Sequence, residues 1–211
     1  METILIFLTA VVVLTPAIVL HEFAHGWIAN QLGDSTARLA GRLTLNPLKH
    51  VDPVGTVLIP GTIFLLNFFR ITHGLMPFGW AKPIPVNFRA LNNPKRDMIW
   101  VALAGPAVNI MLASFFSLFW KLDMSTGWRI LLEYSIYLNL YLAVFNLVPI
   151  PPLDGSRIMM GLLPRDMARA YSQLEPFGLL IVVVLINMGF FSFTYPLVDY
   201  LANLLGVGKW I

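Results

Sequence analysis

The sequence contains no cysteine, so disulfide bonds, thiolate zinc ligands and cysteine nucleophiles are excluded and the redox compartment cannot be inferred. Charge is scarce as well. Charged residues make up 12% of the 211 residues, hydrophobic residues make up 57%, and the mean hydropathy is +0.74. A soluble domain carries about twice that share of charge. Since no stretch is long and polar enough for a separate soluble domain, we expect one integral-membrane domain over residues 1–211.

The apolar segments predict an all-α polytopic membrane protein with about five transmembrane helices. A spanning helix needs about 20 predominantly apolar residues. The expected spans are residues 4–30, 98–120, 130–150 and 177–191, with a shorter one at 196–207.

The stretch His21-Glu22-Phe23-Ala24-His25 lies inside an apolar run that begins at Ile4. On a helix, His21 and His25 are four residues apart and share one face, so two imidazoles can reach one Zn²⁺. Glu22 lies one position round the helix, placed to take a proton from a metal-bound water. The alternative is a helix end that emerges into water here. Because the apolar character continues beyond the motif, we favour a metal site at membrane depth.

A catalytic zinc usually has three protein ligands and one water, so a third ligand must lie elsewhere in the chain. The extended motif that supplies a third histidine is excluded, because the positions it requires hold Ile28 and Gln31. Asp154 is the strongest candidate, since it follows a stretch, residues 149–152, whose prolines must unwind the preceding helix. The alternative is that Asp154 caps a short helix at 156–163. Candidates in loops or at span ends are His50, His73, Asp123, Glu133, Glu175 and Asp199.

Two asparagines interrupt apolar stretches. Asn146, eight residues before Asp154, could donate a hydrogen bond to the oxyanion of a tetrahedral intermediate, and the alternative is a hydrogen bond between helices. For Asn109 we favour close packing with Gly105 beside the site, and we also include Asn109 among the candidate substrate-binding residues.

The stretch Gly79-Trp80-Ala81-Lys82-Pro83-Ile84-Pro85-Val86-Asn87 has prolines at alternate positions. Pro83 and Pro85 exclude a helix and predict an edge strand or a hairpin. An edge strand near Ile84 and Val86 could bind an unwound peptide by strand addition. Ile84 and Val86 are therefore candidate substrate-binding residues.

Residues 54–69 are apolar but short for a span, and Pro60-Gly61 interrupts them. If they span, basic loops lie on both sides of the membrane. If they re-enter, one side holds eleven Lys and Arg residues and the other holds only Lys121 and Arg129, which the positive-inside rule favours. We therefore predict a re-entrant or partly inserted segment, an outside N-terminus and a metal site toward the cytoplasmic face. The net charge of +3 reflects such flanking residues, so it gives no reason to expect a nucleic-acid partner.

In combination, the motifs at His21–His25, Gly105–Asn109 and Asn146 through Leu153-Asp154-Gly155 resemble the site-2 protease family of intramembrane zinc metalloproteases. The stretch 79–87 also resembles the extended loop of compact bacterial and archaeal members. The resemblance covers most of the chain, from residue 1 to residue 180. It implies an all-α bundle with a three-helix catalytic core within residues 1–160, a small β-hairpin, and C-terminal helices within 175–208.

Residue by residue, the resemblance implies that His21, His25 and Asp154 bind one Zn²⁺, that Glu22 is the general base and acid, and that Asn146 stabilises the intermediate. The implied partners are a single-span membrane-protein substrate and the lipid bilayer, in the cell membrane of a prokaryote. Many members carry a PDZ or CBS domain, and this sequence has no room for either, so substrate selection stays open.

Two other functions use the same residues. A metal or proton transporter could use the His, Glu and Asp cluster as a relay across the membrane. A non-catalytic membrane scaffold is the other, although the intact Glu22 argues against it.

A topology reporter fused after Arg70 tests the re-entrant interpretation of residues 54–69. We expect a cytoplasmic signal, because a re-entrant segment returns the chain to the side from which it entered. A fusion after Lys121 should report the opposite side and serves as the control. A periplasmic or lumenal signal from the Arg70 fusion would overturn the prediction.

Overall fold

The computed structural model describes residues 2–71 and 79–208, and every regular element in this part of the chain is a helix. The α-helices are α1 (Glu2–Gln31), α2 (Thr36–Leu39), α3 (Ile59–Phe68), α4 (Pro94–Ser117), α5 (Thr126–Asn146), α6 (Asp154–Leu162), α7 (Arg165–Ser172), α8 (Gly178–Asn187) and α9 (Thr194–Leu204). The shorter helical segments are η1 (Pro47–Lys49), η2 (Pro53–Leu58), η3 (Phe88–Ala90), η4 (Glu175–Phe177) and η5 (Phe190–Phe193).

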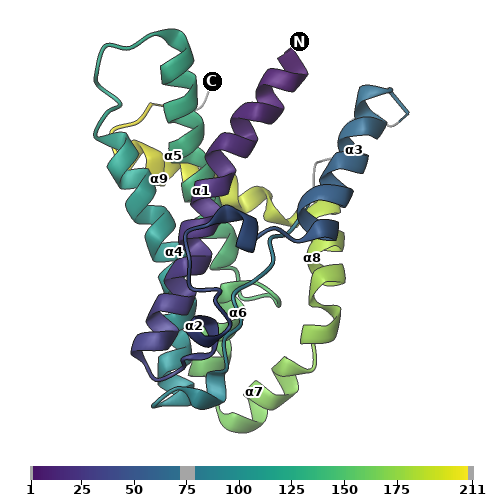
Figure 1. The fold of residues 1–211 in the computed structure, drawn as a ribbon, viewed down its shortest axis with the longest axis vertical. Coiled ribbons are helices and arrows are strands. Elements are labelled where there is room, and N and C mark those ends of the chain that lie inside the picture. Colours follow the sequence, from purple (N-terminus) through teal and green to yellow (C-terminus); the bar gives the residue numbers. More distant parts are fainter. Residues whose placement is uncertain (1, 72–78, 209–211) are drawn as a thin grey trace.

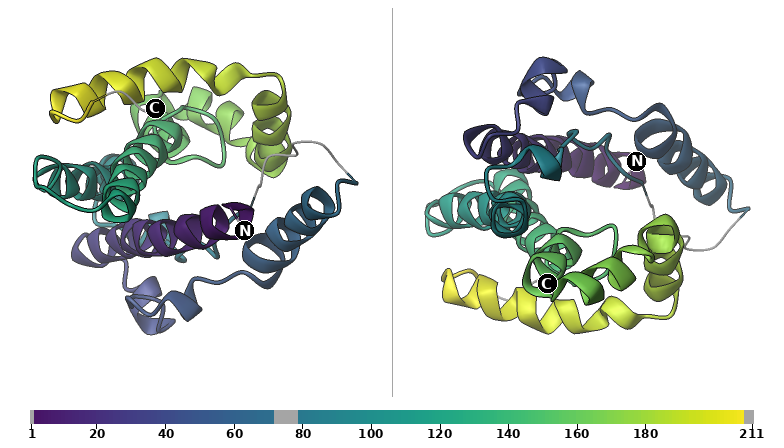
Figure 2. Two further views of the ribbon diagram at one scale, coloured as in Figure 1. Left: turned by 90° about the horizontal axis from the view of Figure 1, so that it is seen from above. Right: turned by 90° about the horizontal axis from the view of Figure 1, so that it is seen from below.

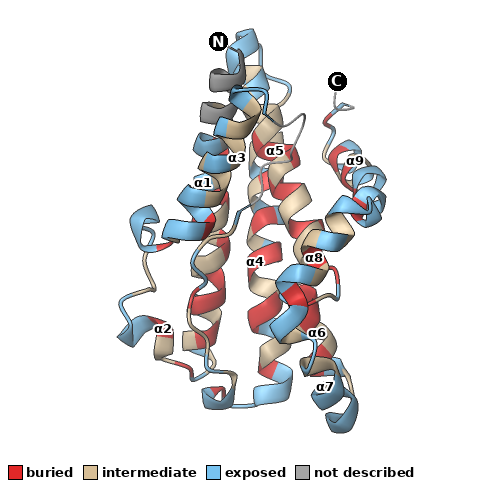
Figure 3. Ribbon diagram, turned by 90° about the vertical axis from the view of Figure 1, so that its right-hand side faces the viewer, coloured by how far each residue is buried: buried red, intermediate tan, exposed pale blue. Residues whose placement is uncertain are grey.

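The long helices α1, α4 and α5 form the centre of the molecule (Figure 1). Helix α4 packs against α1, α5 and the short α6, so it connects the parts of the chain that carry the sequence motifs. Helix α9 lies on one side of this centre, whereas α2 and α3 lie on the other (Figure 2). Buried residues concentrate on the central helices, while α3 and α7 contain no buried residue (Figure 3).

Two apolar clusters fix the relative positions of the central helices. The larger joins α4, α5 and α9 around Ala113, Ile136 and Val198. A smaller one joins α1 to α4 through Ala29 and Val101. Small side chains at the contacts let the helix backbones approach closely, as membrane helices require in the absence of a hydrophobic driving force between them.

The prediction of an all-α membrane protein is confirmed, but the number of spans is lower than expected. Within residues 2–71 and 79–208, three helical segments are long and apolar enough to cross a membrane: Val11–Gln31, Pro94–Ser117 and Arg165–Asn187. Helix α5 falls outside this set, and polar residues such as Arg129 and Glu133 reduce its hydropathy. Helix α9 has 11 residues, which reach only about 16 Å at the helical rise of 1.5 Å per residue.

The predicted edge strand or hairpin at residues 79–87 is wrong, because the described parts of the chain contain no strand. This stretch is extended, but Pro83 and Pro85 offer no N–H for a ladder, and its remaining hydrogen bonds go to η2, to loop residues and to α1. Residues 53–68 form a π-helix, η2, followed by α3, and together they are shorter than a span.

Candidate metal centre

Helix α1 and the first turn of α6 bring three donor atoms together. The Nε2 atoms of His21 and His25 lie 3.0 Å apart, and Oδ2 of Asp154 lies 3.1 Å and 3.3 Å from them. Both histidines are buried. Four ligands arranged tetrahedrally around zinc at 2.0–2.1 Å are separated by about 3.3 Å. The three atoms thus stand close to the edge lengths that a zinc tetrahedron requires.

The tautomer of His25 is fixed by a backbone carbonyl of α4. Its Nδ1 lies 2.7 Å from the oxygen of Val101. Because a carbonyl oxygen can only accept, Nδ1 carries the proton, and the lone pair of the neutral ring is on Nε2. This lone pair faces the other two donor atoms.

The tautomer of His21 is fixed by a chain of amides that ends at another backbone carbonyl. Asn139 donates from Nδ2 to the oxygen of Ser135 at 2.8 Å, so its Oδ1 is left to accept from Asn109 Nδ2, also at 2.8 Å. Oδ1 of Asn109 then faces Nδ1 of His21 at 2.5 Å. Both asparagines are buried. Since each amide orientation follows from the last, His21 donates from Nδ1 and keeps its lone pair on Nε2.

Three atoms with lone pairs therefore converge in a largely buried place, and Oδ2 of Asp154 is buried without a hydrogen-bond partner. Such an arrangement is costly unless positive charge lies among the atoms. A proton can satisfy one pair, whereas a divalent cation satisfies all three. Two neutral imidazoles and a carboxylate, each imidazole held from behind, form a donor set that suits a hydrolytic zinc ion. The residues fit the metal that the sequence predicts.

The carboxylate of Asp154, which lies outside the candidate spans, is available to a cation. Burial alone would raise the pKa of Asp154, but a positive charge on His25, which a proton supplies when no metal ion is bound, outweighs burial. This charge holds the pKa of Asp154 well below its usual range, so the carboxylate stays ionised.

Two glycines allow the helices to approach the donor atoms. A Cβ atom at Gly105 would lie 2.4 Å from His25 Nε2 and 2.6 Å from His21 Nε2. A Cβ atom at Gly155 would lie 2.2 Å from the oxygen of Leu147, so glycine lets the first turn of α6 pack against the turn that follows α5. Gly105 thus lies directly beside the site.

The structure places the other predicted residues as follows. Glu22 accepts a hydrogen bond at Oε2 from the N–H of Ile84, at 2.8 Å. Asn146 is the last residue of α5 and donates from Nδ2 to the oxygen of Leu142 at 2.9 Å, so its contact with an oxyanion stays a prediction. Asn109 holds His21 from behind, and the prediction that it binds substrate likewise remains untested.

Among the described residues, the remaining ligand candidates lie outside the group of three donor atoms. His50 bonds through Nε2 to the oxygen of Thr44, and Glu175 pairs with Arg157. His73 lies outside the described residues. Reasoning from the sequence missed Asn139, although an asparagine within an apolar run, four residues after Ser135, is a signal for a buried polar contact.

Fold and site together define a membrane metallopeptidase, since a membrane helix supplies two histidines and a glutamate and a second segment supplies a carboxylate. The model of peptidase family M50 matches residues 119–188. “Putative zinc metalloprotease YwhC” of Bacillus subtilis is 40% identical over 83% of this chain and 78% of its own. The protein of the same description named Rip2, from Mycolicibacterium smegmatis, is 32% identical over 86% of this chain and 69% of its own. The chain belongs to peptidase family M50, the site-2 proteases. No solved structure gives a significant match.

Replacing Asn109 with leucine should lower the zinc affinity of the purified protein about 10- to 100-fold, because His21 loses the partner that fixes its tautomer. A competition titration against a chromophoric chelator measures the affinity. Asn203→Leu is the matched control, because Asn203 is an exposed helical asparagine that bonds only one turn back along α9. Equal zinc affinity in the two variants would contradict the role of Asn109.

Replacing Gly105 with alanine should abolish stoichiometric zinc binding, since the new methyl group must displace one of the two imidazoles. Gly61→Ala is the control, because a Cβ atom at this helical glycine meets nothing within 4 Å. Zinc content after dialysis distinguishes them. A Gly105→Ala protein that retains one zinc per chain would show that α4 can move away from the histidines.

Proposed function

We propose that this protein hydrolyses a peptide bond of a membrane-spanning protein substrate within or near the lipid bilayer. The observation that carries the proposal is the group of three donor atoms from His21, His25 and Asp154. Helix α1, which carries the two histidines and Glu22, is long and apolar enough to cross a membrane. Membership of family M50 supports the same reaction.

Zinc, when bound, would polarise the scissile carbonyl and lower the pKa of a water molecule. Glu22 takes a proton from the attacking water and returns it to the leaving amine. Asn146, at the end of α5, donates a hydrogen bond to the negative charge that develops on the carbonyl oxygen. His21 and His25 donate their Nδ1 protons to Asn109 and Val101, which leaves Nε2 of each ring free to bind the metal.

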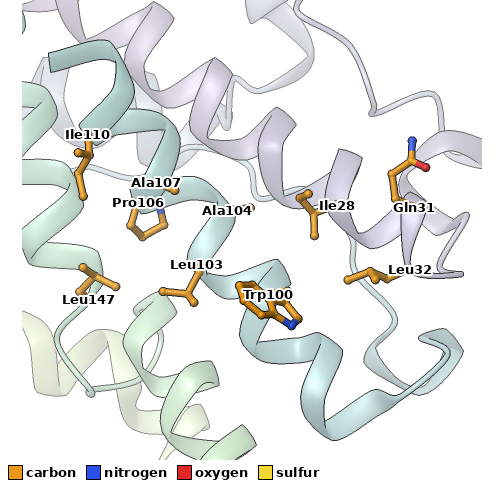
Figure 4. A pocket seen from close by; sticks show the side chains of 10 residues that line it. All are labelled: Ile28, Gln31, Leu32, Trp100, Leu103, Ala104, Pro106, Ala107, Ile110 and Leu147. Atoms are coloured by element: carbon orange, nitrogen blue, oxygen red, sulfur yellow. The ribbon is translucent and has the colours of Figure 1, made fainter. Parts of the chain in front are cut away.

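A substrate helix must unwind before cleavage, since its amides are otherwise hydrogen-bonded internally. An apolar pocket of about 620 Å³ between α1 and α4 suits apolar side chains of such a substrate (Figure 4). Ala104 and Pro106 in its lining flank Gly105, and Leu147 follows Asn146.

We also propose a topology in which residues 54–69 re-enter, the N-terminus lies outside and the site faces the cytoplasm. The basic residues of the loops support this orientation. The relatives come from bacteria and an archaeon, which supports the cell membrane of a prokaryote.

The transporter and scaffold functions are less favoured. A relay needs Glu22 among the exchanging ligands, whereas Glu22 lies outside the group of three donors and bonds to Ile84.

Glu22→Gln should bind zinc as the wild type does and lose cleavage by about 10²-fold or more, because an amide cannot act as a general base. The test is bound zinc and cleavage of a panel of single-span membrane substrates, both measured in detergent. Zinc near one per chain in both proteins, with cleavage by the wild type alone, would establish the protease. Metal flux in vesicles by the wild type, with no cleavage of any substrate, would favour the transporter instead.

A further inference from the structure

Residues 80–87, which we name the strap, run in extended conformation along α1 and the loop before η2. From Trp80 to Ile84, every second N–H points inward, as in a strand. Trp80 donates to the oxygen of Gly55 at 3.1 Å, and Lys82 donates to the oxygen of His50 at 2.9 Å. The next N–H in this series is that of Ile84, which donates to Oε2 of Glu22 at 2.8 Å.

The strap is fixed on both sides of Ile84. On one side, Nη2 of Arg42 donates to the oxygens of Lys82 and Pro83, at 2.9 Å and 3.3 Å. On the other side, the N–H of Asn87 donates to Oδ2 of the buried Asp34 at 2.6 Å. A segment held at both ends presents the N–H between them in a fixed place.

The prolines on either side of Ile84 leave its N–H without a neighbouring backbone donor. Pro83 and Pro85 have fixed φ and no N–H, so Ile84 carries the one N–H between them. The side chain of Ile84 is buried, and it occupies space that a side chain at Gly26 would need: a Cβ atom there would lie 2.9 Å from Ile84 Cγ2. Gly26 is four residues after Glu22, on the same face of α1. The glycine therefore lets the strap reach the carboxylate.

We propose that the strap is a positioning element for the general base. The N–H of Ile84 holds Oε2 of Glu22 by a charge-assisted hydrogen bond and directs Oε1 to the attacking water. Without it, the side chain of Glu22 samples other rotamers, and misplacement by about 1 Å is enough to slow such a reaction strongly. The inference rests on the proposed function, in which Glu22 moves the proton.

This role differs from strand addition. Ile84 directs its N–H inward, to the protein, and the opposite edge of the strap has carbonyl oxygens but no N–H at Pro83 and Pro85. Loss of a positioning contact should lower kcat, whereas loss of a strand-addition contact should raise KM. Measuring both constants therefore distinguishes the two roles.

The test is Ile84→Pro, which removes the N–H. We expect kcat to fall about 10-fold or more, by less than in Glu22→Gln, with KM within about twofold and zinc content unchanged. Ile84→Val retains the N–H and should recover most of the lost kcat. Ala81→Pro makes the same kind of change on the opposite edge and should leave kcat near that of the wild type.

The outcomes are distinct. An increase in kcat for Ile84→Pro would show that the strap inhibits Glu22, and a rise in KM alone would show that Ile84 binds substrate; either overturns the proposal, as does an unchanged kcat. If the wild type itself cleaves nothing on the substrate panel, the proposed function fails first, and the next measurement still decides the contact.

Hydrogen–deuterium exchange at the Ile84 amide tests the contact without catalysis or a disturbed strap. Glutamine at position 22 can still accept through Oε1, whereas alanine cannot. Exchange at Ile84 should therefore be at least about 10-fold faster in Glu22→Ala than in Glu22→Gln, although both variants lack the base. Equal exchange rates in the two would refute the contact.

Discussion

The convergence of three lone pairs, on two imidazoles and one carboxylate, is the constraint on which the rest of the structure depends. Such atoms repel one another in a low-dielectric interior, so the two imidazoles need hydrogen bonds on their far sides to keep their lone pairs in place. Val101 holds His25, and the series from Asn109 through Asn139 to the carbonyl of Ser135 holds His21. The packing of α4 between α1 and α5 is therefore part of the metal centre.

Close approach is the second requirement, and glycines meet it at three places. Gly105 lets α4 pack closely against the imidazoles, Gly155 lets α6 pack against the turn after α5, and Gly26 lets the strap pack against α1. A glycine inside a helix costs about 0.5–1 kcal/mol relative to alanine. At each of the three positions a side chain would clash with the segment that approaches there. The positions of these glycines therefore indicate the location of the site, as the positions of the charged residues do.

Local patterns in the sequence predicted the ligands but not what holds them. The spacing of His21 and His25 fixes a shared helix face, and prolines before Asp154 mark the unwound turn. By contrast, the contact of Asn109 with His21 joins residues 88 positions apart and depends on how α1 and α4 are rotated, which no local pattern specifies. The hairpin failed for a related reason: prolines show which N–H groups of residues 79–87 are missing, but not what the others bind.

His21 and Glu22 are neighbours in the chain, yet different parts of the fold support them. Consecutive helical side chains point about 100° apart, so His21 faces α4 and α5 while Glu22 faces the strap. A reacting carbonyl must lie between these two directions, with the metal on one side and the base on the other. Metal binding and proton transfer then depend on separate contacts, and a change in one support can leave the other intact. The adjacent residues of the motif thus define the two walls of the active site.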